Sequence, residues 1–335
     1  MIITRAPLRI SLLGGGTDLT QFYKKQPSYI FGGSIDKYVY VISNNLSKFS
    51  TERFRFTYRV TESVKNYKDF QHPVVRECFE LFPKIKSLNL TTFSDIPGGT
   101  GLGSSSSFTV ALLGNLMERS NSRISPRILS DQAIHLERNV LNESGGVQDQ
   151  LHASYGGLRF YKLSSIGLNQ GKNLSDSTIF HELNKSILLV RVGGFRKSKE
   201  MHGIEKLNRN QILYLEKIQQ IASYFKKKFD SQDSNFSLLT ECINESWELK
   251  KRMSDHISND EVEEVINKGM RYGASAAKLC GAGTSGFVLF LANQTHLKKI
   301  ESKFKADKIE YVKFINSGFE TMTLMEGQNN WNAHQ

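Results

Sequence analysis

The stretch Pro97-Gly98-Gly99-Thr100-Gly101-Leu102-Gly103-Ser104-Ser105-Ser106-Ser107 decides the fold of this chain. Before it, residues 87–93 alternate apolar and polar side chains, as a strand does. After it, Phe108, Leu112 and Leu116 recur every four positions, as in a helix. The glycines therefore lie in a strand-to-helix turn, and the serines begin the helix. Free backbone N–H groups and the positive end of the helix dipole meet there, which predicts an anion site, best suited to a nucleoside triphosphate.

Two other interpretations of this loop are weaker. Gly/Ser-rich composition is typical of flexible linkers, but a linker rarely joins a strand so tightly to an apolar helix. A Walker A loop would continue into Gly-Lys-Ser or Gly-Lys-Thr, and no such lysine follows the glycines here. If the loop binds ATP, positive charge must come from a metal ion or from elsewhere in the chain.

Length and composition indicate a globular protein of two domains, since 335 residues with 39% hydrophobic and 23% charged content can form two cores.

We expect no membrane partner, because no run of eighteen apolar residues occurs and residues 1–5 lack the apolar segment of a signal peptide. Three widely separated cysteines favour a reducing, cytoplasmic location over disulfides or a zinc site. Polar residues around 164–180 suggest domains at 1–175 and 176–335.

The net charge of +11 and the pI of 9.4 raise nucleic acid or an anionic membrane as partners. The lysines are scattered, however, and the densest runs, Lys226–Lys228 and Lys250–Arg252, fall within helical patterns, where we expect solvated faces. No basic stripe with stacking aromatic residues accompanies them. We therefore expect no nucleic-acid partner. A basic balance also suits an enzyme of phosphorylated small molecules.

The first glycine turn in chain order, Gly14-Gly15-Gly16-Thr17-Asp18, follows a predicted strand over residues 2–13. Arg9 lies on the polar side of that strand and leads into the turn. Asp18 accepts hydrogen bonds only, when ionised, so it can hold sugar hydroxyls. It can equally cap a helix that begins at Leu19, and the sequence leaves both roles open. A glycine pair, Gly32-Gly33, precedes the next strand-like run.

Two carboxylates in the middle of the chain are candidates for chemistry. Glu137 lies beside the apolar face of a helix that starts at Ser125-Pro126, and none of its helical neighbours is a cation. Its burial would need compensation, for which a bound metal would serve, whereas a glutamate at the edge of the face would simply reach water. Asp149 lies between two glycine pairs on a short helical segment and can accept a proton from a substrate hydroxyl. Aspartates are also common beside glycine turns.

The apolar face beside Glu137, on the helix that starts at Ser125-Pro126, contains Leu129, Ala133, Leu136 and Val140.

The second half of the chain offers two further loops. Arg196, Lys197 and Lys199 follow a predicted strand, 187–192, and either bind a substrate phosphate or form a basic surface loop. Helical patterns cover roughly 205–229, 235–254 and 260–279. Gly281–Gly286 fits GxGxxG, but it follows a helix and precedes a strand, which is the wrong order for a dinucleotide site. We expect this loop to pack its backbone against the first glycine site.

In this order and spacing, the three glycine segments resemble the GHMP small-molecule kinases, named for galactokinase, homoserine kinase, mevalonate kinase and phosphomevalonate kinase. The matching stretches are Arg5–Asp18, Pro97–Ser107 and Lys278–Gly286, and the middle one is highly specific. The Gly-Gly-Gly-Thr-Asp form is most similar to the family's D-glycero-D-manno-heptose 7-phosphate kinases, whereas galactokinases usually carry Gly-Glu-His-Thr-Asp. The third stretch departs from the glycine-rich family form at Thr284-Ser285.

The resemblance implies a two-domain α/β (α+β) GHMP kinase fold. Its N-terminal domain would be similar to ribosomal protein S5 domain 2, and its C-terminal domain would be ferredoxin-like. It implies ATP-dependent phosphorylation of the anomeric hydroxyl of a heptose 7-phosphate, giving a 1,7-bisphosphate for surface polysaccharide synthesis. A kinase of another sugar, such as fucose, and a non-catalytic sugar sensor on this fold are the alternatives. The partners would be ATP and a sugar phosphate, with the oligomeric state left open and a homodimer among the options.

The resemblance also assigns roles to residues. ATP would lie along Pro97–Ser107, and Mg²⁺ would bind at Ser105 and Glu137. Asp149 would receive the hydroxyl proton and Arg9 would lie near the transferred phosphoryl group. The expected substrate-binding positions are Gly16, Thr17, Asp18, Gly33, Arg196, Lys197 and Gly283.

Overall fold

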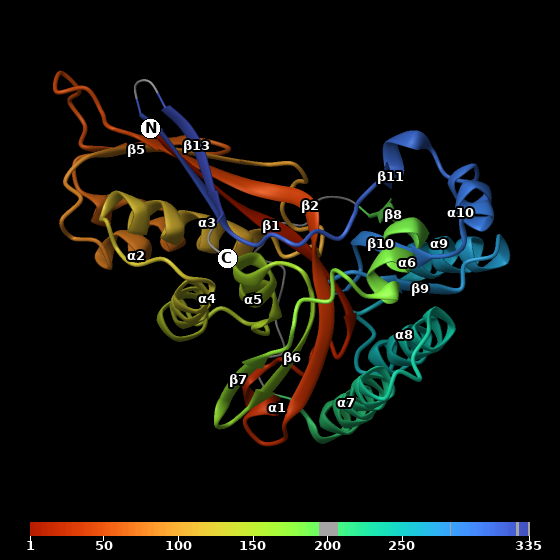
Figure 1. Cartoon of the computed structure of the whole chain (residues 1–335). Helices are drawn as coiled ribbons and strands as arrows, with labels where there is room; N and C mark the ends of the chain where they lie inside the picture. The colour runs from red at the N-terminus through yellow and green to blue at the C-terminus, as the bar shows by residue number, and fades with distance from the viewer. Residues whose placement is uncertain (194–206, 282, 326–327, 334–335) are drawn as a thin grey trace.

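The computed structural model describes residues 1–193, 207–281, 283–325 and 328–333. Two antiparallel-dominated sheets organise the chain (Figure 1). The larger has nine strands, in the order β13-β12-β1-β2-β5-β3-β4, with β6 paired to β2 and to β7. These strands are β1 (Ile2–Leu13), β2 (Ser28–Asn44), β3 (Phe54–Thr57), β4 (Thr61–Val64), β5 (Leu88–Ser94), β6 (Leu158–Ser164), β7 (Gly167–Gln170), β12 (Glu320–Met325) and β13 (Gln328–Ala333).

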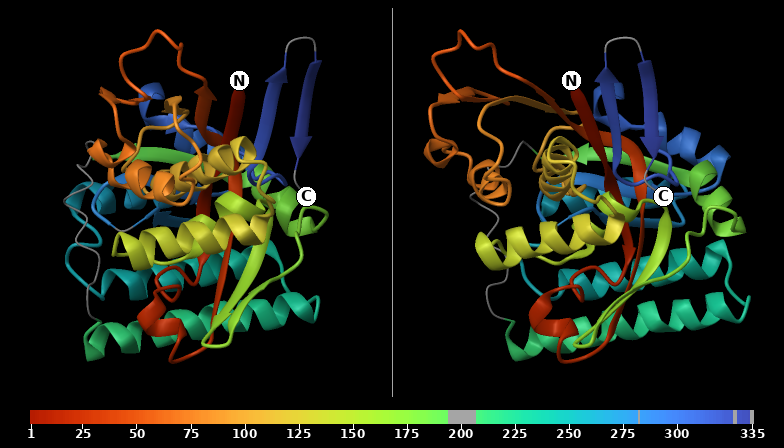
Figure 2. Two further views of the ribbon diagram at one scale, coloured as in Figure 1. Left: turned by 90° about the vertical axis from the view of Figure 1, so that its left-hand side faces the viewer. Right: turned by 60° about the vertical axis from the view of Figure 1, so that its left-hand side comes forward.

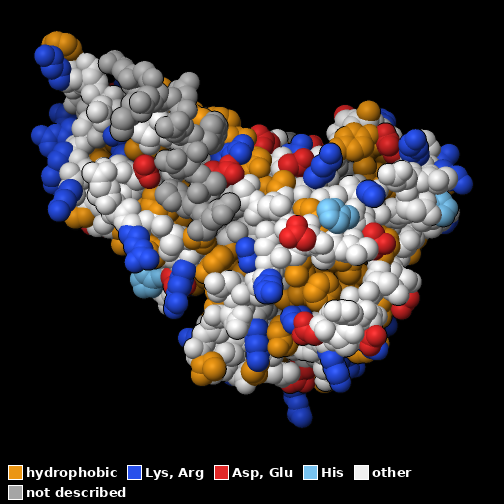
Figure 3. All heavy atoms as spheres, viewed as in Figure 1, with side chains coloured by type: hydrophobic (Ala, Val, Ile, Leu, Met, Phe, Trp, Pro, Cys, Tyr) orange, Lys and Arg blue, Asp and Glu red, His pale blue; other side chains and the backbone are white. Residues whose placement is uncertain are grey.

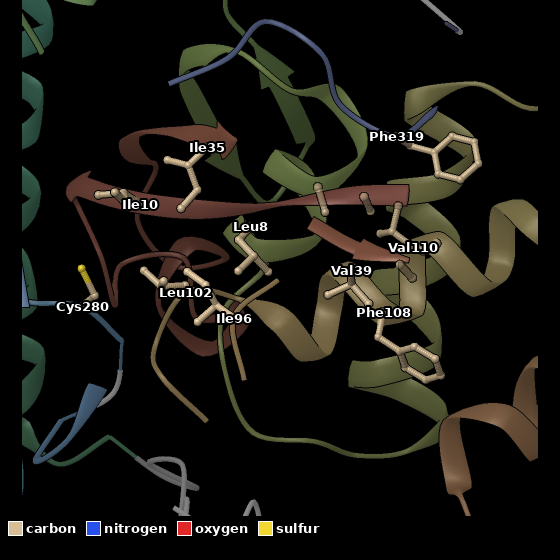
Figure 4. Packing of buried hydrophobic residues seen from close by; sticks show 14 of the residues in the cluster. Leu8, Ile10, Ile35, Val39, Ile96, Leu102, Phe108, Val110, Cys280 and Phe319 are labelled. Carbon is tan, nitrogen blue, oxygen red and sulfur yellow. The ribbon is translucent and has the colours of Figure 1, made fainter. Parts of the chain in front are cut away.

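Most helices of the first half pack on this sheet around one central helix that contacts β1 and β2, as Figure 2 shows from two sides. The central helix is α3, which begins at Ser104 as the sequence predicts; because it packs between the sheet and other helices, every residue from Ser106 to Met117 is buried. Figure 4 shows Leu8 and Ile10 of β1 in this core, together with Leu102 and Cys280 from two loops. The helices are α1 (Thr20–Tyr23), α2 (Pro73–Glu80), α3 (Ser104–Arg119), α4 (Pro126–His135) and α5 (Gln148–Tyr155), with a 3₁₀ turn at Tyr67–Asp69.

The smaller sheet has the order β11-β8-β10-β9, and all its pairings are antiparallel. Its chain order, strand–helices–strand–strand–helix–strand, is the ferredoxin-like arrangement, so this part of the prediction is confirmed. The elements are α6 (Thr178–Ser186), β8 (Ile187–Val192), α7 (Arg209–Asp230), α8 (Phe236–Lys251), α9 (Asp260–Arg271), β9 (Ala276–Leu279), β10 (Gly286–Leu291), α10 (Gln294–Glu301), a 3₁₀ turn at Ala306–Lys308 and β11 (Ile309–Glu310).

The chain does not stay in its second domain to the end. Strand β12 pairs with β1, and β13 extends the same edge of the larger sheet. The division into 1–175 and 176–335 is therefore too simple, because the last described strands complete the first domain. Figure 1 shows β13 beside the N-terminus of the chain.

Two helical predictions are corrected. The predicted helix over 260–279 ends at Arg271, because Gly273 takes a left-handed φ of 100° and terminates it, and β9 follows. The apolar face that ends at Val140 also loses its phase: residues Leu136–Val140 form a π-helical segment, whose wider turn leaves Val140 42% exposed.

The distribution of surface charge and the character of the helices can be compared with the partners considered from the sequence. Lys and Arg side chains are spread over the face in Figure 3 among acidic ones. Among the described residues, none of the helices combines the length and the apolar character needed to cross a bilayer.

Candidate active site

Asp149 and Arg9 form the centre of the site. Arg9 Nε donates to Asp149 Oδ1 at 2.8 Å, and Arg9 Nη1 donates to the Gly101 carbonyl at 2.7 Å. Arg9 comes from β1, with its side chain 7% exposed, and Asp149 from the first turn of α5, with 25% exposed. The carboxylate lies against Gly103, whose added Cβ would be 3.3 Å from Asp149 Oδ2. Strand β1, the glycine loop and α5 thus bring together the Arg9 guanidinium and the partly accessible Asp149 carboxylate. The sequence pointed to these two residues in separate stretches.

Asp18 is buried, with 1% of the residue exposed. Its Oδ1 accepts from the Gly16 N–H at 2.9 Å and its Oδ2 from the Gln148 N–H at 3.1 Å. Leu19 at the start of α1 has no side-chain cap, so Asp18 caps α5 across the fold instead of the helix that follows it. Burial raises the pKa of the Asp18 carboxyl, the charge of Asp149 adds to the increase, and the two N–H donors oppose it. Asp18 therefore links the first glycine turn to the helix that carries Asp149.

The loop before α3 has the geometry of an anion site. Gly99, Gly101 and Gly103 all take left-handed φ values of 81–82°, and no side chain caps the N-terminus of α3. The first N–H groups of this 16-residue helix are left for a ligand.

Only part of the serine run is available to a nucleotide. Ser104 and Ser105 are partly or fully exposed, whereas the Ser107 hydroxyl donates to the Pro7 carbonyl at 2.7 Å inside the core. The Leu102 side chain is 1% exposed. The Ser107 hydroxyl and the Leu102 side chain thus pack in the core, and the nucleotide contacts expected of these two residues stay predictions.

Glu137 is 1% exposed, and its Oε2 accepts from Ser106 Oγ at 2.9 Å and from Gln150 Nε2. The Arg138 guanidinium also lies 3.2 Å from this oxygen. The expectation that no local cation pairs with Glu137 is thus wrong, because the π-helical segment and the long Arg138 side chain allow adjacent residues to meet. Burial raises the pKa of the Glu137 carboxyl, and Arg138 counteracts this effect.

The residues around Glu137 fit a Mg²⁺ ion. Glu137 Oε1 is buried and has no hydrogen-bond partner among the described residues. Carboxylate and hydroxyl oxygens are ligands that Mg²⁺ prefers, completed by water and phosphate oxygens. No group of three or more His, Cys, Asp and Glu side chains that could hold a metal occurs among the described residues. The serine that donates to this carboxylate is Ser106, and the metal contact expected of Ser105 stays a prediction.

The Gly281–Gly286 loop packs against the Pro97–Ser107 loop, as the sequence predicts. A Cβ on Gly101 would lie 2.3 Å from the Cys280 carbonyl oxygen, and one on Gly281 would lie 2.5 Å from the Gly101 Cα. The two loops therefore touch backbone to backbone. The loop joins β9 to β10, so its order is strand–loop–strand instead of the predicted helix–loop–strand.

The remaining residues expected to bind the substrate make contacts within the fold or lie outside the described residues. The Thr17 hydroxyl donates to the Gly14 carbonyl at 2.8 Å and holds the turn. Gly33 lies within β2, where a Cβ would meet the Phe314 ring at 2.5 Å, and Gly283 packs on the His256 carbonyl. These contacts favour packing over substrate binding. Gly16 contacts Asp18 through its N–H, whereas Arg196 and Lys197 lie outside the described residues.

Sequence reasoning missed two lysines beside the glycine loops, one buried and one half-buried. Lys278 of β9 is 7% exposed, and its Nζ donates to the carbonyls of Ser11 and Leu12 at 2.9 and 3.3 Å. Lys250 of α8 donates to the Gly281 carbonyl at 2.9 Å. The sequence placed Lys250 on a solvated face, because helical periodicity does not show which side of a long helix meets another domain.

Lys278 makes the stability of the protein depend on pH. Burial lowers the pKa of Lys278 to about 7, and the charge of Lys250 adds to the effect. The unfolded chain then binds more protons than the folded one between pH 7 and 10, so the wild type should gain stability over Lys278→Met by up to about 1.4 kcal/mol per pH unit in that range. Urea unfolding at pH 6, 7, 8 and 9 measures this difference. A difference that does not change with pH would mean that Lys278 stays charged.

Comparison with known proteins agrees with the family resemblance seen in the sequence. Residues 67–157 match the model of the GHMP kinases N terminal domain, and residues 221–309 match that of the GHMP kinases C terminal, together more than half of the chain. The chain is 29% identical over 312 residues to the D-glycero-alpha-D-manno-heptose 7-phosphate kinase of Campylobacter jejuni, covering 88% of this chain and 90% of that protein.

Solved structures show the same fold. The D-glycero-D-manno-heptose 1-phosphate kinase from Bacteroides thetaiotaomicron has a TM-score of 0.77 at 22% identity, covering 97% of this chain and all of that one. The Methanococcus jannaschii mevalonate kinase has a TM-score of 0.71 at 17% identity, covering 94% and 98%.

The fold and the site define a small-molecule kinase. The chain belongs to the GHMP kinase family. It is accordingly an ATP-dependent phosphotransferase with an alcohol group as acceptor, a sugar kinase.

Proposed function

We propose that this kinase transfers the γ-phosphoryl group of ATP to the anomeric hydroxyl of D-glycero-D-manno-heptose 7-phosphate. The product would be the 1,7-bisphosphate, a precursor of a nucleotide-activated heptose for surface polysaccharides. The observation that carries the proposal is the Arg9–Asp149 pair held between the Gly-Gly-Gly-Thr-Asp turn and the loop before α3. The Campylobacter jejuni relative bears the name of this activity, and its alignment spans nearly the whole chain.

In this proposal the chain's residues act mainly by positioning and charge. The N–H groups at the start of α3 hold the nucleotide phosphates, and the left-handed glycines allow them to approach the backbone. The Asp149 carboxylate accepts the proton of the acceptor hydroxyl as the hydroxyl oxygen attacks the γ-phosphorus and ADP leaves. Arg9 keeps this carboxylate in place and offsets charge on the phosphoryl group.

The metal would be held by Glu137 with one of the first serines of α3. When bound, Mg²⁺ neutralises charge on the nucleotide phosphates. Asp18 orients α5 through the Gln148 N–H, which fixes Asp149 relative to the first glycine turn. Asp18 remains our proposed sugar contact, although both of its oxygens already accept backbone hydrogen bonds.

A pair of serine variants decides which hydroxyl serves the metal. The contact between Ser106 and Glu137 predicts that Ser106→Ala weakens binding of Mn²⁺ with ADP by about tenfold or more, whereas Ser105→Ala changes it by less than about threefold. Electron paramagnetic resonance of free Mn²⁺ measures both, with Glu137→Gln as the reference for loss of the carboxylate. The reverse order of the two variants would return the role to Ser105.

Release of ADP from magnesium-ATP tests the acceptor. The panel contains heptose 7-phosphate, heptose 1-phosphate, the unphosphorylated heptose, fucose and galactose. Turnover restricted to the 7-phosphate is expected. Turnover of fucose or galactose would keep the kinase but replace its substrate, and no turnover with any sugar would return the non-catalytic sensor.

A further inference from the structure

Lys250 reaches the junction of the three glycine loops from the second domain. Its Nζ donates to the Gly281 carbonyl at 2.9 Å, in the loop that packs on Gly101. The same side chain lines a small pocket with Gly14 and Gly15 of the first turn. Helix α8 therefore delivers one ammonium group to the place where all three loops meet.

The charges around Lys250 are those of the candidate active site. Burial lowers the pKa of Lys250, the Asp18 carboxylate opposes this, and Arg9 and Asp149 act on it with opposite signs. The carboxylates of Asp18 and Asp149 and the guanidinium of Arg9 thus act on Lys250 before any phosphate binds. A nucleotide phosphate would add negative charge, which an ammonium group held there offsets.

The hydrogen bonds of the neighbouring cations distinguish Lys250 from them. Arg9 already donates to Asp149 and to Gly101, and Lys278 donates to two carbonyls at the end of β1. Lys250 makes a single hydrogen bond among the described residues, and an ammonium group has three N–H donors. Two donors therefore remain for a ligand.

We propose that Lys250 is a catalytic residue contributed by the second domain, whose ammonium group contacts the phosphoryl group during transfer. The inference rests on the proposed positions of the nucleotide and of Asp149. It supplies the positive charge that the glycine loop lacks, since no Walker A lysine follows it. In phosphoryl transfer the charge is spread over the equatorial oxygens of the moving group, so an ammonium group held beside the glycine loops stabilises the transition state more than bound ATP.

The experiment compares Lys250→Met and Lys250→Arg with Lys251→Met. Lys251 is the matched control, because it is the next residue on α8 and pairs with Glu248 and Glu263 instead of the site. Steady-state turnover gives kcat, and calorimetry gives the affinity for magnesium-ADP with and without aluminium fluoride, which mimics the moving phosphoryl group. We expect Lys250→Met to lower kcat about 100-fold and to lose most of the affinity that fluoride adds, with ADP affinity within about twofold.

Lys250→Arg should retain part of both effects, and Lys251→Met should match the wild type. Equal loss of ADP and ADP–fluoride affinity in Lys250→Met, or a kcat within about threefold of wild type, would overturn the proposal and leave Lys250 as a link to Gly281. Thermal unfolding shows whether each variant folds. If Lys250→Met does not fold, Lys250→Arg is compared with Lys251→Arg for kcat and for the affinity that fluoride adds. A loss of both in Lys250→Arg alone supports the proposal, and equal values in the two variants overturn it. The fluoride measurement uses no sugar, so it stays informative even if the acceptor assignment fails.

Discussion

Asp149→Asn lowers kcat by about 10²- to 10⁴-fold, because the amide cannot accept the hydroxyl proton that the carboxylate takes. The amide keeps the size of the side chain, and the Arg9 guanidinium still has the Gly101 carbonyl as a partner, so the site should stay assembled. ADP release measures kcat, and calorimetry measures the affinity for magnesium-ATP, which should change by less than about threefold.

Asp131→Asn is the matched control for this variant. Its carboxylate lies on α4 with 59% of the side chain exposed and pairs only loosely with Arg127, at 3.7 Å. Its kcat should equal that of the wild type. Near-normal turnover in Asp149→Asn would remove Asp149 as the base, and lost ATP affinity would show that the substitution disturbs the loop as a whole.

We expect Gly101→Ala to destabilise the fold by about 3 kcal/mol or more and to abolish nucleotide binding. Gly101 has a φ of 82°, and its Cβ would lie 2.3 Å from the Cys280 carbonyl oxygen, so the two glycine loops must separate. Backbone atoms on both sides cannot yield as a flexible side chain can. Calorimetric unfolding and ADP titration measure the two effects.

The Gly167→Ala variant distinguishes the cost of backbone strain from the cost of the steric clash that Gly101→Ala creates with Cys280. Gly167 also has a positive φ, of 136°, but nothing lies within 4 Å of its added Cβ. We expect it to cost about 1 kcal/mol through backbone strain alone. A similar loss in both variants would mean that contact between the loops contributes little.

The local pattern around Pro97–Ser107 was sufficient to predict the central turn and helix, because strand alternation, glycines and a four-residue apolar repeat agree there. The same holds for β1 and for α5 with Asp149. These elements are set by short-range periodicity, and the family resemblance extended them to the two-domain fold, including the ferredoxin-like sheet.

The misses have physical causes that local pattern does not contain. A π-helical segment turned Val140 outward and brought Arg138 to Glu137. Long-range pairing returned β12 to β1 and placed β13 on the same edge, and the packing of α8 against the glycine loops brought the half-buried Lys250 to the Gly281 carbonyl. Whether a serine hydroxyl faces a ligand or the core, as for Ser105 and Ser107, depends on helix rotation, which composition does not fix.

The ³¹P NMR spectrum of the product formed from magnesium-ATP and heptose 7-phosphate shows which bond the enzyme makes. We predict a second sugar phosphorus signal that is coupled to the anomeric proton and grows in equal amount with ADP. A new signal coupled to any other sugar proton, or ADP with inorganic phosphate alone, would contradict the assignment of an anomeric kinase.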